Sequence, residues 1–334
     1  MNIAIQDNIA ETKVQQLCWI IIRQIKLKQF LVGNPLPPVN KAVDIYGVSR
    51  DTVVKAYKSL QEKGWLTSIP CKGFYVKKCC NVGKERVFVF FDTMNQYKET
   101  LYRALVGELG DKYEITTAFH YYDRKLFDAL LSNANCKFDH YVVIPHFNED
   151  VSSILNQLPP EQLLLLDGFP KGYEYNCAAV YQDFFNDIYE ELKQLYPKLK
   201  KYTSLHIVYN GKFQFIPDSL AAGLFRFSGE YRFPIFIEPE FQMEDIQEGH
   251  CYMAVSERDL ANLIKVVQKK SWKLSKEIGL MSLDDTPLKE VLMDGITTVS
   301  TDFEYMGRTA AQLIKNGETR RICNPCMVHD RGSL

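Results

Sequence analysis

The sequence has few of the features that mark membrane proteins, secreted proteins or common enzymes. No stretch of the 334 residues approaches 18 consecutive apolar residues, so we expect no transmembrane helix. The first residues, MNIAIQDNIAETK, lack the basic and apolar regions of a signal peptide, and the nine scattered cysteines suit reduced thiols in a cytoplasm. GxSxG, P-loop and HExxH motifs are absent too. We therefore expect a cytoplasmic protein that is not an enzyme and needs no cofactor.

Neither the cysteines nor the histidines form a recognisable metal-binding pattern. The single CxxC motif, Cys323 to Cys326, has no second cysteine pair and no histidine at ligand spacing. Structural zinc needs four such ligands, so we predict no metal site. A redox role for the motif is an alternative, but no helix is predicted to begin there and lower a thiol pKa. The histidines are dispersed, and His146 follows an apolar run that would place it near a ligand.

Charge is unevenly distributed along the chain, although its total is close to zero. Residues 1–78 contain 12 Lys and Arg against 5 Asp and Glu, whereas residues 79–334 contain 28 against 36. A basic first part is typical of a nucleic-acid-binding domain, and an acidic remainder disfavours nonspecific wrapping of DNA. Many basic surfaces only face solvent, so charge alone does not establish DNA binding. The sequence motif inside residues 1–78 is needed to distinguish the two cases.

Residues 36–63 have the pattern of a helix-turn-helix. Gly47 can adopt the positive φ of a tight turn, and Ser49 is a favourable N-cap for the next helix. In that helix the apolar residues recur at the spacing of one buried face: Val53, Ala56, Tyr57 and Leu60. The other side chains then face outward: Arg50, Asp51, Val54, Lys55 and Lys58. A short helix that presents Arg and Lys near its start suits the major groove of DNA.

A β-hairpin with a basic tip follows this helix. Gly64 ends the helix, and Trp65 and Leu66 open a strand. Pro70 to Gly73 form a turn that contains Lys72, and 74–76 form the returning strand. Such a wing is placed to contact phosphates or the minor groove. The alternative is a winged helix that binds another protein.

These features resemble the winged-helix domain of the GntR family of regulators. The resemblance covers residues 1–78 and is carried by Leu36, Pro37, Val48, Ser49, Arg50, Thr52, Val53, Ala56, Leu60, Gly64, Gly73, Phe74 and Val76. Asn40 and Val54 depart from it, because the family usually has basic residues at both positions. It implies that double-stranded DNA is contacted by Arg50, Ser49, Thr52, Lys55, Lys72 and Gly73.

After a short polar linker at 79–85, the pattern changes to strands that alternate with helices. The apolar runs include VFVFF, HYVVI, LLLLD, HIVYN and CYMAV. This alternation predicts βαβ units, and hence an α/β body with parallel sheets. The strands are too many for one small sheet, so we predict two doubly wound subdomains with a cleft between them. Ligands of such sheets bind at the carboxyl ends of the strands.

The body, 86–334, resembles the effector domain of the LacI family, which shares the type I periplasmic-binding-protein fold. The resemblance is carried by Asp167, Asp284, Asp285, Thr297, Thr298, Gly307 and Ala310. Glu257 and Arg258 replace the Asn-Asp pair of that family, and Leu220 stands where it has a ligand-clamping arginine. A GntR-type winged helix joined to a LacI-type body resembles the arabinose-type repressors of sugar operons. The resemblance implies ligand binding and dimerisation by the body.

A sugar site combines acids that accept hydrogen bonds from hydroxyls with aromatic rings that pack on C–H faces. Acids near strand ends are Asp92, Asp167, Asp183, Asp284 and Glu257. Aromatic residues in the same loops are Tyr97, Phe147, Phe169, Tyr181 and Phe215. We predict that these residues and Arg258 bind the ligand, with Lys212 as a substitute for the missing arginine. Each acid has a simpler alternative role, as a helix N-cap or in a surface turn.

The predicted function is that of a DNA-binding repressor of a sugar-utilisation operon. The resemblance implies a homodimer, with the helix from Thr100 to Leu109 as a candidate interface. It also implies that a monosaccharide, such as fucose or a pentose, releases the protein from its operator. A sensor of a nucleoside or a sugar phosphate is the main alternative. A sugar-processing enzyme, an aminotransferase-like fusion and a sensor of protein partners are others, but no catalytic motif supports the enzymes.

Overall fold

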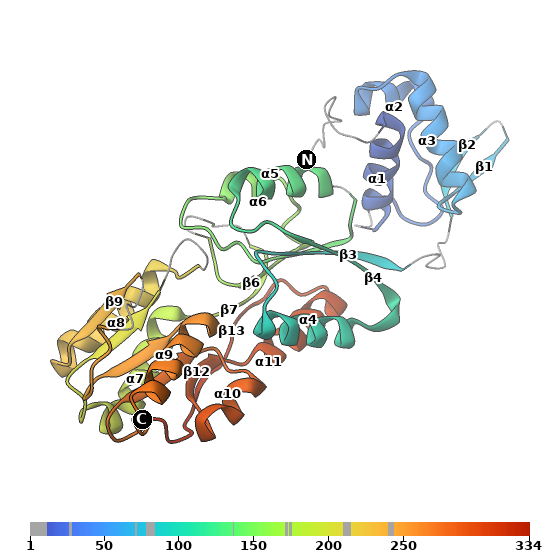
Figure 1. The fold of residues 1–334 in the computed structure, drawn as a ribbon. Helices are drawn as coiled ribbons and strands as arrows, with labels where there is room; N and C mark the ends of the chain where they lie inside the picture. The colour runs from blue at the N-terminus through green and yellow to red at the C-terminus, as the bar shows by residue number, and fades with distance from the viewer. Residues whose placement is uncertain are drawn as a thin grey trace. The chain divides into compact units, whose positions relative to one another are not determined.

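The structure, a computed structural model, describes residues 12–26, 29–70, 72–77, 84–135, 137–170, 173, 176–209, 215–239 and 244–334. Most of the predicted linker, 79–83, and Lys212 lie outside these ranges. The described chain forms a winged helix and two α/β lobes (Figure 1). The second lobe and much of the first belong to one compact unit, Val89–Gly110, Thr117–Phe127 and Tyr141–Leu334.

Three helices and a hairpin form the winged helix: α1 (Lys13–Lys26), α2 (Val39–Tyr46), α3 (Arg50–Glu62), β1 (Leu66–Ile69) and β2 (Gly73–Val76). Gly47 has a φ of 65° and donates its N–H to the carbonyl of Val43, which ends α2. The Ser49 hydroxyl accepts the N–H of Thr52 at 3.2 Å and caps α3. The predicted turn and cap are therefore confirmed.

One apolar core holds these elements together. Val53, Ala56, Tyr57 and Leu60 of α3 are all buried, as their spacing predicted, and pack with residues of α1 such as Leu17. The Tyr57 hydroxyl donates to the carbonyl of Pro37 at 2.9 Å. Strands β1 and β2 are antiparallel, with Leu66 opposite Val76 and Ile69 opposite Gly73. The charged residues Arg50, Asp51, Lys55 and Lys58 on the outward face of α3 are exposed, as are Lys72 and Gly73 of the hairpin.

The first lobe is a six-stranded sheet in the order β13-β7-β6-β5-β3-β4. Its strands are β3 (Glu85–Phe91), β4 (Tyr113–Phe119), β5 (His140–Val143), β6 (Leu163–Asp167), β7 (Ala178–Tyr181) and β13 (Arg321–Cys323). Its helices are α4 (Gln96–Leu109), η1 (Gly110–Lys112), α5 (Arg124–Ala134), α6 (Ser152–Leu155) and α11 (Phe303–Asn316). Figure 1 shows α4 and α11 on one face of this sheet, and α5 and α6 on the other.

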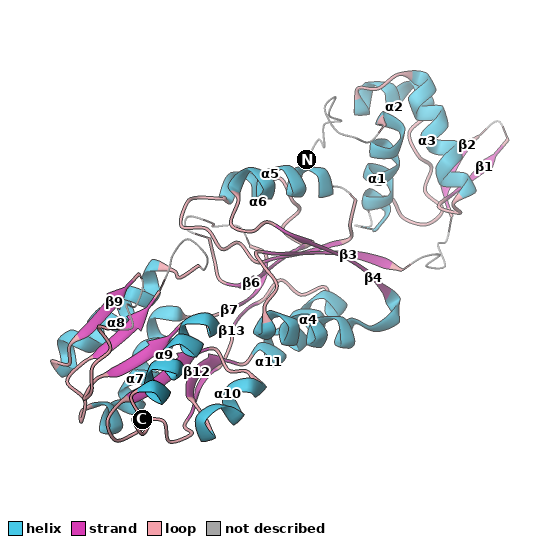
Figure 2. Cartoon of the chain, in the orientation of Figure 1, coloured by secondary structure: helices cyan, strands magenta, loops and turns pink. Residues whose placement is uncertain are grey.

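The second lobe is a six-stranded sheet in the order β14-β12-β11-β10-β8-β9. Its strands are β8 (Leu205–Val208), β9 (Ile235–Glu238), β10 (Cys251–Ala254), β11 (Gly279–Leu283), β12 (Thr297–Thr301) and β14 (Cys326–His329). Its helices are α7 (Phe184–Leu199), α8 (Asp218–Tyr231), α9 (Glu257–Lys269), α10 (Pro287–Val291) and η2 (Leu292–Asp294). The predicted α/β class with two sheets is confirmed, and Figure 2 shows helices beside both.

In the second lobe, one strand departs from the predicted parallel pairing. The pairs β8–β9, β8–β10, β10–β11 and β11–β12 are parallel, but β14 runs antiparallel to β12, with Thr301 opposite Cys326. The chain leaves the second lobe after Thr301 and returns to it at Cys326. Because it re-enters where β12 ends, it can only run back along that strand.

In the described residues the chain crosses between the lobes three times, after Tyr181, after Thr301 and after Cys323. Asn324 links all three crossings. Its N–H donates to the carbonyl of Tyr181 at 2.7 Å, and its Nδ2 donates to Thr301 Oγ1 at 2.7 Å and to the carbonyl of Asp302 at 2.9 Å. Asn324 is buried, so these bonds are shielded from water. Any change in the angle between the lobes has to be taken up at these crossings.

None of the helices in the described ranges is long and apolar enough to span a membrane.

Candidate DNA-binding surface and ligand pocket

The predicted DNA-contacting residues lie on α3 and on the hairpin. Arg50 and Lys55 are exposed on α3, and Lys72 and Gly73 are exposed at the tip of the hairpin. Lys55 Nζ lies 2.7 Å from Asp51 Oδ2, one helical turn earlier, and both side chains are largely exposed. The Ser49 hydroxyl is shared between the N–H of Thr52 and its hydroxyl, 2.9 Å away. Ser49 therefore has a structural role in the helix-turn-helix as well as the predicted one.

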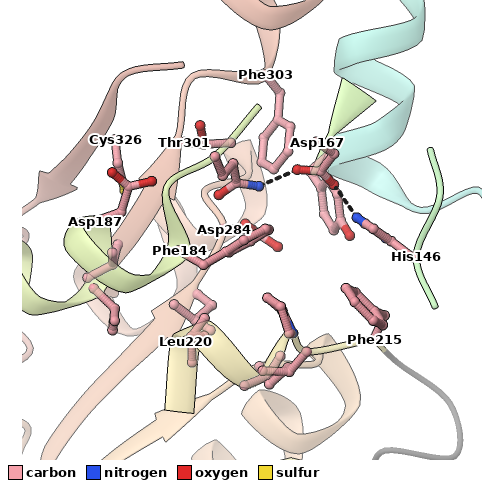
Figure 3. Close-up of a pocket in the computed structure, with 18 residues that line it drawn as sticks. His146, Asp167, Phe184, Asp187, Phe215, Leu220, Asp284, Thr301, Phe303 and Cys326 are labelled. Carbon is pink, nitrogen blue, oxygen red and sulfur yellow. Dashed lines mark hydrogen bonds and ion pairs between the residues drawn. The ribbon is translucent and has the colours of Figure 1, made fainter. Parts of the chain in front are cut away.

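A cavity lies where the strand ends of the two lobes face each other (Figure 3). We call it the acidic chamber, because Asp167, Asp187 and Asp284 line it together with His146. It encloses about 70 Å³. The other lining residues are Tyr97, Gln182, Phe184, Ile188, Phe215, Ile216, Pro217, Leu220, Val255, Leu283, Val299, Thr301, Phe303 and Cys326.

A second cavity adjoins the first and shares His146, Gln182, Phe184, Phe215 and Pro217 with it. We call it the aromatic chamber, because five Phe and Tyr rings line it together with His146. It encloses about 350 Å³. Its other lining residues are Pro145, Phe147, Gly168, Phe169, Tyr181, Asp183 and Ser219.

A buried network of charges forms one wall of the acidic chamber. His146 Nδ1 lies 2.9 Å from Asp92 Oδ2, and His146 Nε2 lies 3.2 Å from Asp167 Oδ2. Lys98 Nζ pairs with the other oxygen of Asp92, and Gln182 donates to the other oxygen of Asp167. Asp92 and Lys98 are almost completely shielded from solvent. Such charges are tolerated only when each has a close partner of opposite sign.

The network keeps His146 protonated at neutral pH. Burial alone would lower its pKa, but the charge of Asp92 and the hydrogen bonds to Asp167 and Asp92 raise the pKa to about 9. The same contacts hold the pKa of Asp92 and of Asp167 below the usual range, although burial opposes this. The ring of His146 also stacks on Phe215, with 4.6 Å between centroids. The imidazolium is thus fixed between a carboxylate on each side and an aromatic face.

Asp284 projects into the chamber from the second lobe and differs electrostatically from Asp167. Burial raises its pKa to about 6; Lys289 opposes this shift and Asp167 contributes to it. Lys289 does not pair with the carboxylate: its Nζ donates to the carbonyls of Leu283 and Asp284, at 2.8 and 2.7 Å. Asp284 is therefore ionised but weakly compensated at neutral pH, which leaves its oxygens able to accept hydrogen bonds from a ligand.

Asp187, on the first turn of α7, is the third acid of the chamber. Burial, followed by the negative charge of Asp183, raises its pKa to about 7. Its Oδ2 is buried without a hydrogen-bond partner in the chain. A buried oxygen of this kind is costly unless something else satisfies it. A ligand hydroxyl is one group that would do so.

The structure brings together some of the predicted ligand residues and not others. Asp167, Asp284, Tyr97 and Phe215 line the acidic chamber; Phe147, Phe169, Tyr181, Asp183 and again Phe215 line the aromatic chamber. Asp183 also caps α7 by accepting the N–H of Asn186. Asp92 lies behind His146, where Lys98 and His146 use both of its oxygens.

Glu257 and Arg258 are exposed at the start of α9 and line neither chamber. Residues of the acidic chamber that were not predicted to bind the ligand include Gln182, Phe184, Asp187, Thr301, Phe303 and Cys326. Most of them lie at the three crossings between the lobes, and no sequence pattern marks where the chain crosses. Leu220, predicted to stand at the position of a clamping arginine, does line the acidic chamber.

Asp285, next to Asp284, has a structural role. Arg331 donates to both of its oxygens, at 2.7 and 2.8 Å, and Thr298 donates at 2.8 Å. This bidentate pair fastens the end of the chain to the loop after β11. Within the described part of the chain, no three His, Cys, Asp or Glu residues gather in a way that could hold a metal ion.

Comparison with known proteins agrees with both parts of the structure. Residues 13–76 match the family described as bacterial regulatory proteins, gntR family. No match is found among curated proteins. Solved structures resemble the chain at low identity, and the following three illustrate the likeness.

The trehalose repressor of Escherichia coli is 17% identical, with a TM-score of 0.61 over 74% of this chain and 100% of that one. A LacI family regulator from Lactobacillus casei, with bound glucose, is 13% identical, with a TM-score of 0.61 over 75% of this chain and 100% of that one. A LacI family regulator from Enterococcus faecium, with bound ribose, is 15% identical, with a TM-score of 0.59 over 75% of this chain and 98% of that one. At such identities the likeness establishes a shared fold.

Residues 13–76 are thus a GntR-family winged helix, the body has the fold of LacI-family regulators, and the chain is a DNA-binding transcriptional regulator that joins the two.

Proposed function

We propose that the protein represses a sugar-utilisation operon and leaves its operator when a monosaccharide binds in the acidic chamber. The composition of the chamber supports this most strongly. It offers three acidic side chains, an imidazolium and aromatic rings, and no Lys or Arg is among the described residues that line it. Carboxylates accept hydrogen bonds from several hydroxyls, and rings pack on the C–H faces of a sugar. A phosphate would meet the carboxylates of Asp167 and Asp284, the partly ionised Asp187 and only one cation, so a neutral sugar suits the site better than a sugar phosphate.

The apolar wall of the chamber bears on which sugar binds. Leu220, Val255 and Leu283 from the second lobe line it, and Leu220 replaces a residue that would have been charged. A methyl group placed against such a wall contributes about 0.8 kcal/mol for each buried carbon. Of the candidates, fucose has a methyl group as its C6, whereas a pentose has no methyl group. Fucose is therefore our first choice and arabinose our second. The glucose and ribose bound in the two similar structures are in keeping with a sugar ligand.

The DNA-binding step rests on α3 and the hairpin. Arg50 would read a base edge in the major groove, while Ser49, Thr52, Lys55, Lys72 and Gly73 would contact phosphates. A homodimer would place two such helices on a near-palindromic operator in the cytoplasm. In this proposal residues 1–78 bind DNA, and 86–334 bind the sugar and the second copy without catalysing a reaction. The exposed side of α4, with Thr100 and Arg103, is the candidate dimer surface.

Ligand binding would act through the angle between the lobes. Asp167 comes from the first lobe and Asp284 from the second, so a sugar that bonds to both favours a closed arrangement. Closure would pivot at the crossings that Asn324 holds together. A ligand shifts this equilibrium only by as much as it prefers the closed form.

The experiment combines a stability screen with a DNA-release assay. The purified protein is heated with L-fucose, arabinose, ribose, glucose, their phosphates and nucleosides, and a bound ligand raises the melting temperature by mass action. An operator selected from random DNA then reports release by fluorescence anisotropy. We expect one neutral sugar both to raise the melting temperature and to release the DNA. A response only to phosphates or nucleosides would refute the proposal.

A further inference from the structure

The aromatic chamber has no role in the proposed binding of a single sugar ring. It borders the acidic chamber, because the two share the lining residues His146, Gln182, Phe184, Phe215 and Pro217. Its volume, about 350 Å³, lies in the range of ligand sites, whereas the 70 Å³ of the acidic chamber is small for a ligand of more than one sugar ring. A molecule seated against Asp284 and Asp167 therefore has a direct path into the second chamber.

The rings of the aromatic chamber are held in place and are partly accessible. Phe169 and Tyr181 pack edge to face, with 5.3 Å between centroids, and the guanidinium of Arg321 lies 4.7 Å from the Phe169 centroid. Phe215 is stacked on His146, at the boundary of the two chambers. Phe169, Tyr181, Phe184 and Phe215 all keep part of their surface exposed. Fixed rings of this kind bind flat, apolar faces at little entropic cost.

Polar groups lie among these rings. Gln182, Asp183 and Ser219 line the aromatic chamber, and the Tyr181 side chain adds a hydroxyl. Rings together with hydrogen-bonding groups suit a second sugar ring, which has both C–H faces and hydroxyls. A purely apolar substituent could not form hydrogen bonds with any of these groups.

We propose that the site is built for a glycoside of at least two rings, with one sugar in the acidic chamber and a second in the aromatic chamber. This inference rests on the proposed function, because it assumes that the first ring is a sugar. It predicts that the free monosaccharide binds more weakly than the two-ring glycoside. It also predicts that Phe169, which lines only the aromatic chamber, affects the binding of the second ring alone.

The test compares free sugars with their glycosides by calorimetry. L-fucose, arabinose, ribose and glucose are titrated into the full-length protein, followed by their disaccharides and their α- and β-phenyl glycosides. The same titrations are repeated with Phe169→Ala and with Phe225→Ala. Phe225 is 57% exposed on α8 and lines neither chamber, so its variant is a matched aromatic control.

We expect a disaccharide to bind at least tenfold more tightly than the corresponding free sugar. Phe169→Ala should lower the affinity for the disaccharide about fivefold, because one ring contact is lost, and should leave the affinity for the free sugar unchanged. Phe225→Ala should change neither. Equal or tighter binding of the free sugar would overturn the inference while leaving the proposed function standing, and so would preference for the phenyl glycoside over every disaccharide. If no sugar of either kind binds, both proposals fail.

Discussion

Asp167 and Asp284 occupy equivalent places in the two lobes and share the same unusual backbone conformation. Asp167 ends β6 with a φ of 70°, and Asp284 follows β11 with a φ of 58°. Both strands are third in their sheets, counted from β13 and β14. The left-handed region costs a non-glycine residue about 1 kcal/mol or more, and such strain gathers at functional sites. The backbone is thus strained at both residues, and this conformation directs both carboxylates into one chamber.

Removing the charge of Asp284 should weaken sugar binding. In Asp284→Asn the shape and the left-handed backbone are retained, since Asn tolerates positive φ, but a charged acceptor is lost. A hydrogen bond to a charged group contributes about 1.5–3 kcal/mol, so we expect a loss of affinity of tenfold or more in calorimetry. Operator binding without sugar should not change.

The control is Asp294→Asn. Asp294 also has a positive φ, of 63°, but it is exposed and lines neither chamber. Wild-type affinity in Asp284→Asn would show that this carboxylate does not contact the ligand.

Arg50→Ala should abolish specific operator binding and leave sugar binding intact. Arg50 is exposed at the start of α3, where an arginine can bond to a guanine edge, a contact that provides about 1–3 kcal/mol of discrimination per base. The measurement is anisotropy with the selected operator and with random DNA. Arg320→Ala, which removes an arginine 70% exposed just before β13, is the matched control. Unchanged operator affinity in Arg50→Ala would refute the assignment of α3 as the recognition helix.

Raising the pH should destabilise the protein through His146. The folded-state pKa, about 9, exceeds the ordinary value of 6.5, so the folded protein binds this proton more tightly than the unfolded chain does. The resulting stability is complete below pH 6.5 and is lost as the pH rises through 9. By linkage it is on the order of 3 kcal/mol. Denaturant unfolding between pH 6.5 and 10 measures the slope, which His146→Gln should flatten.

An independent measurement keeps this prediction testable if His146→Gln does not fold. The imidazole resonance of His146 in the wild-type protein should titrate near pH 9, not near 6.5. Titration at the ordinary value would contradict the charge network, whatever the variant does.

The sequence predicted the local features of the fold well and the long-range ones less completely. The Gly47 turn, the Ser49 cap and the buried stripe of α3 depend on neighbouring residues, so spacing alone was enough. Asp167 and Asp284 were found because strand ends in a parallel sheet share one edge.

The position of Asp92 could not be predicted from the sequence. Its partners His146 and Lys98 depend on which strands become neighbours and on how α4 packs, and no local pattern shows this. For the same reason Phe184, Thr301 and Phe303 were missed, since they belong to the crossings between lobes. Glu257 and Arg258 follow a strand, as expected, but they open α9 with their side chains exposed.

Two glycines inside helices should respond in opposite directions to a single added methyl group. A Cβ on Gly307 of α11 would collide with the carbonyl of Leu101 and approach Ala104 and Leu105, because α11 packs closely on α4 there. A Cβ on Gly229 of α8 would meet nothing within 4 Å. Overpacking of this kind costs about 1–3 kcal/mol, whereas Gly→Ala in an open helical position contributes up to about 1 kcal/mol of stability. We therefore expect Gly307→Ala to lower the denaturation midpoint and Gly229→Ala to raise it. Equal shifts in the two variants would mean that α4 and α11 are not in close contact, and that the first lobe is held together in another way.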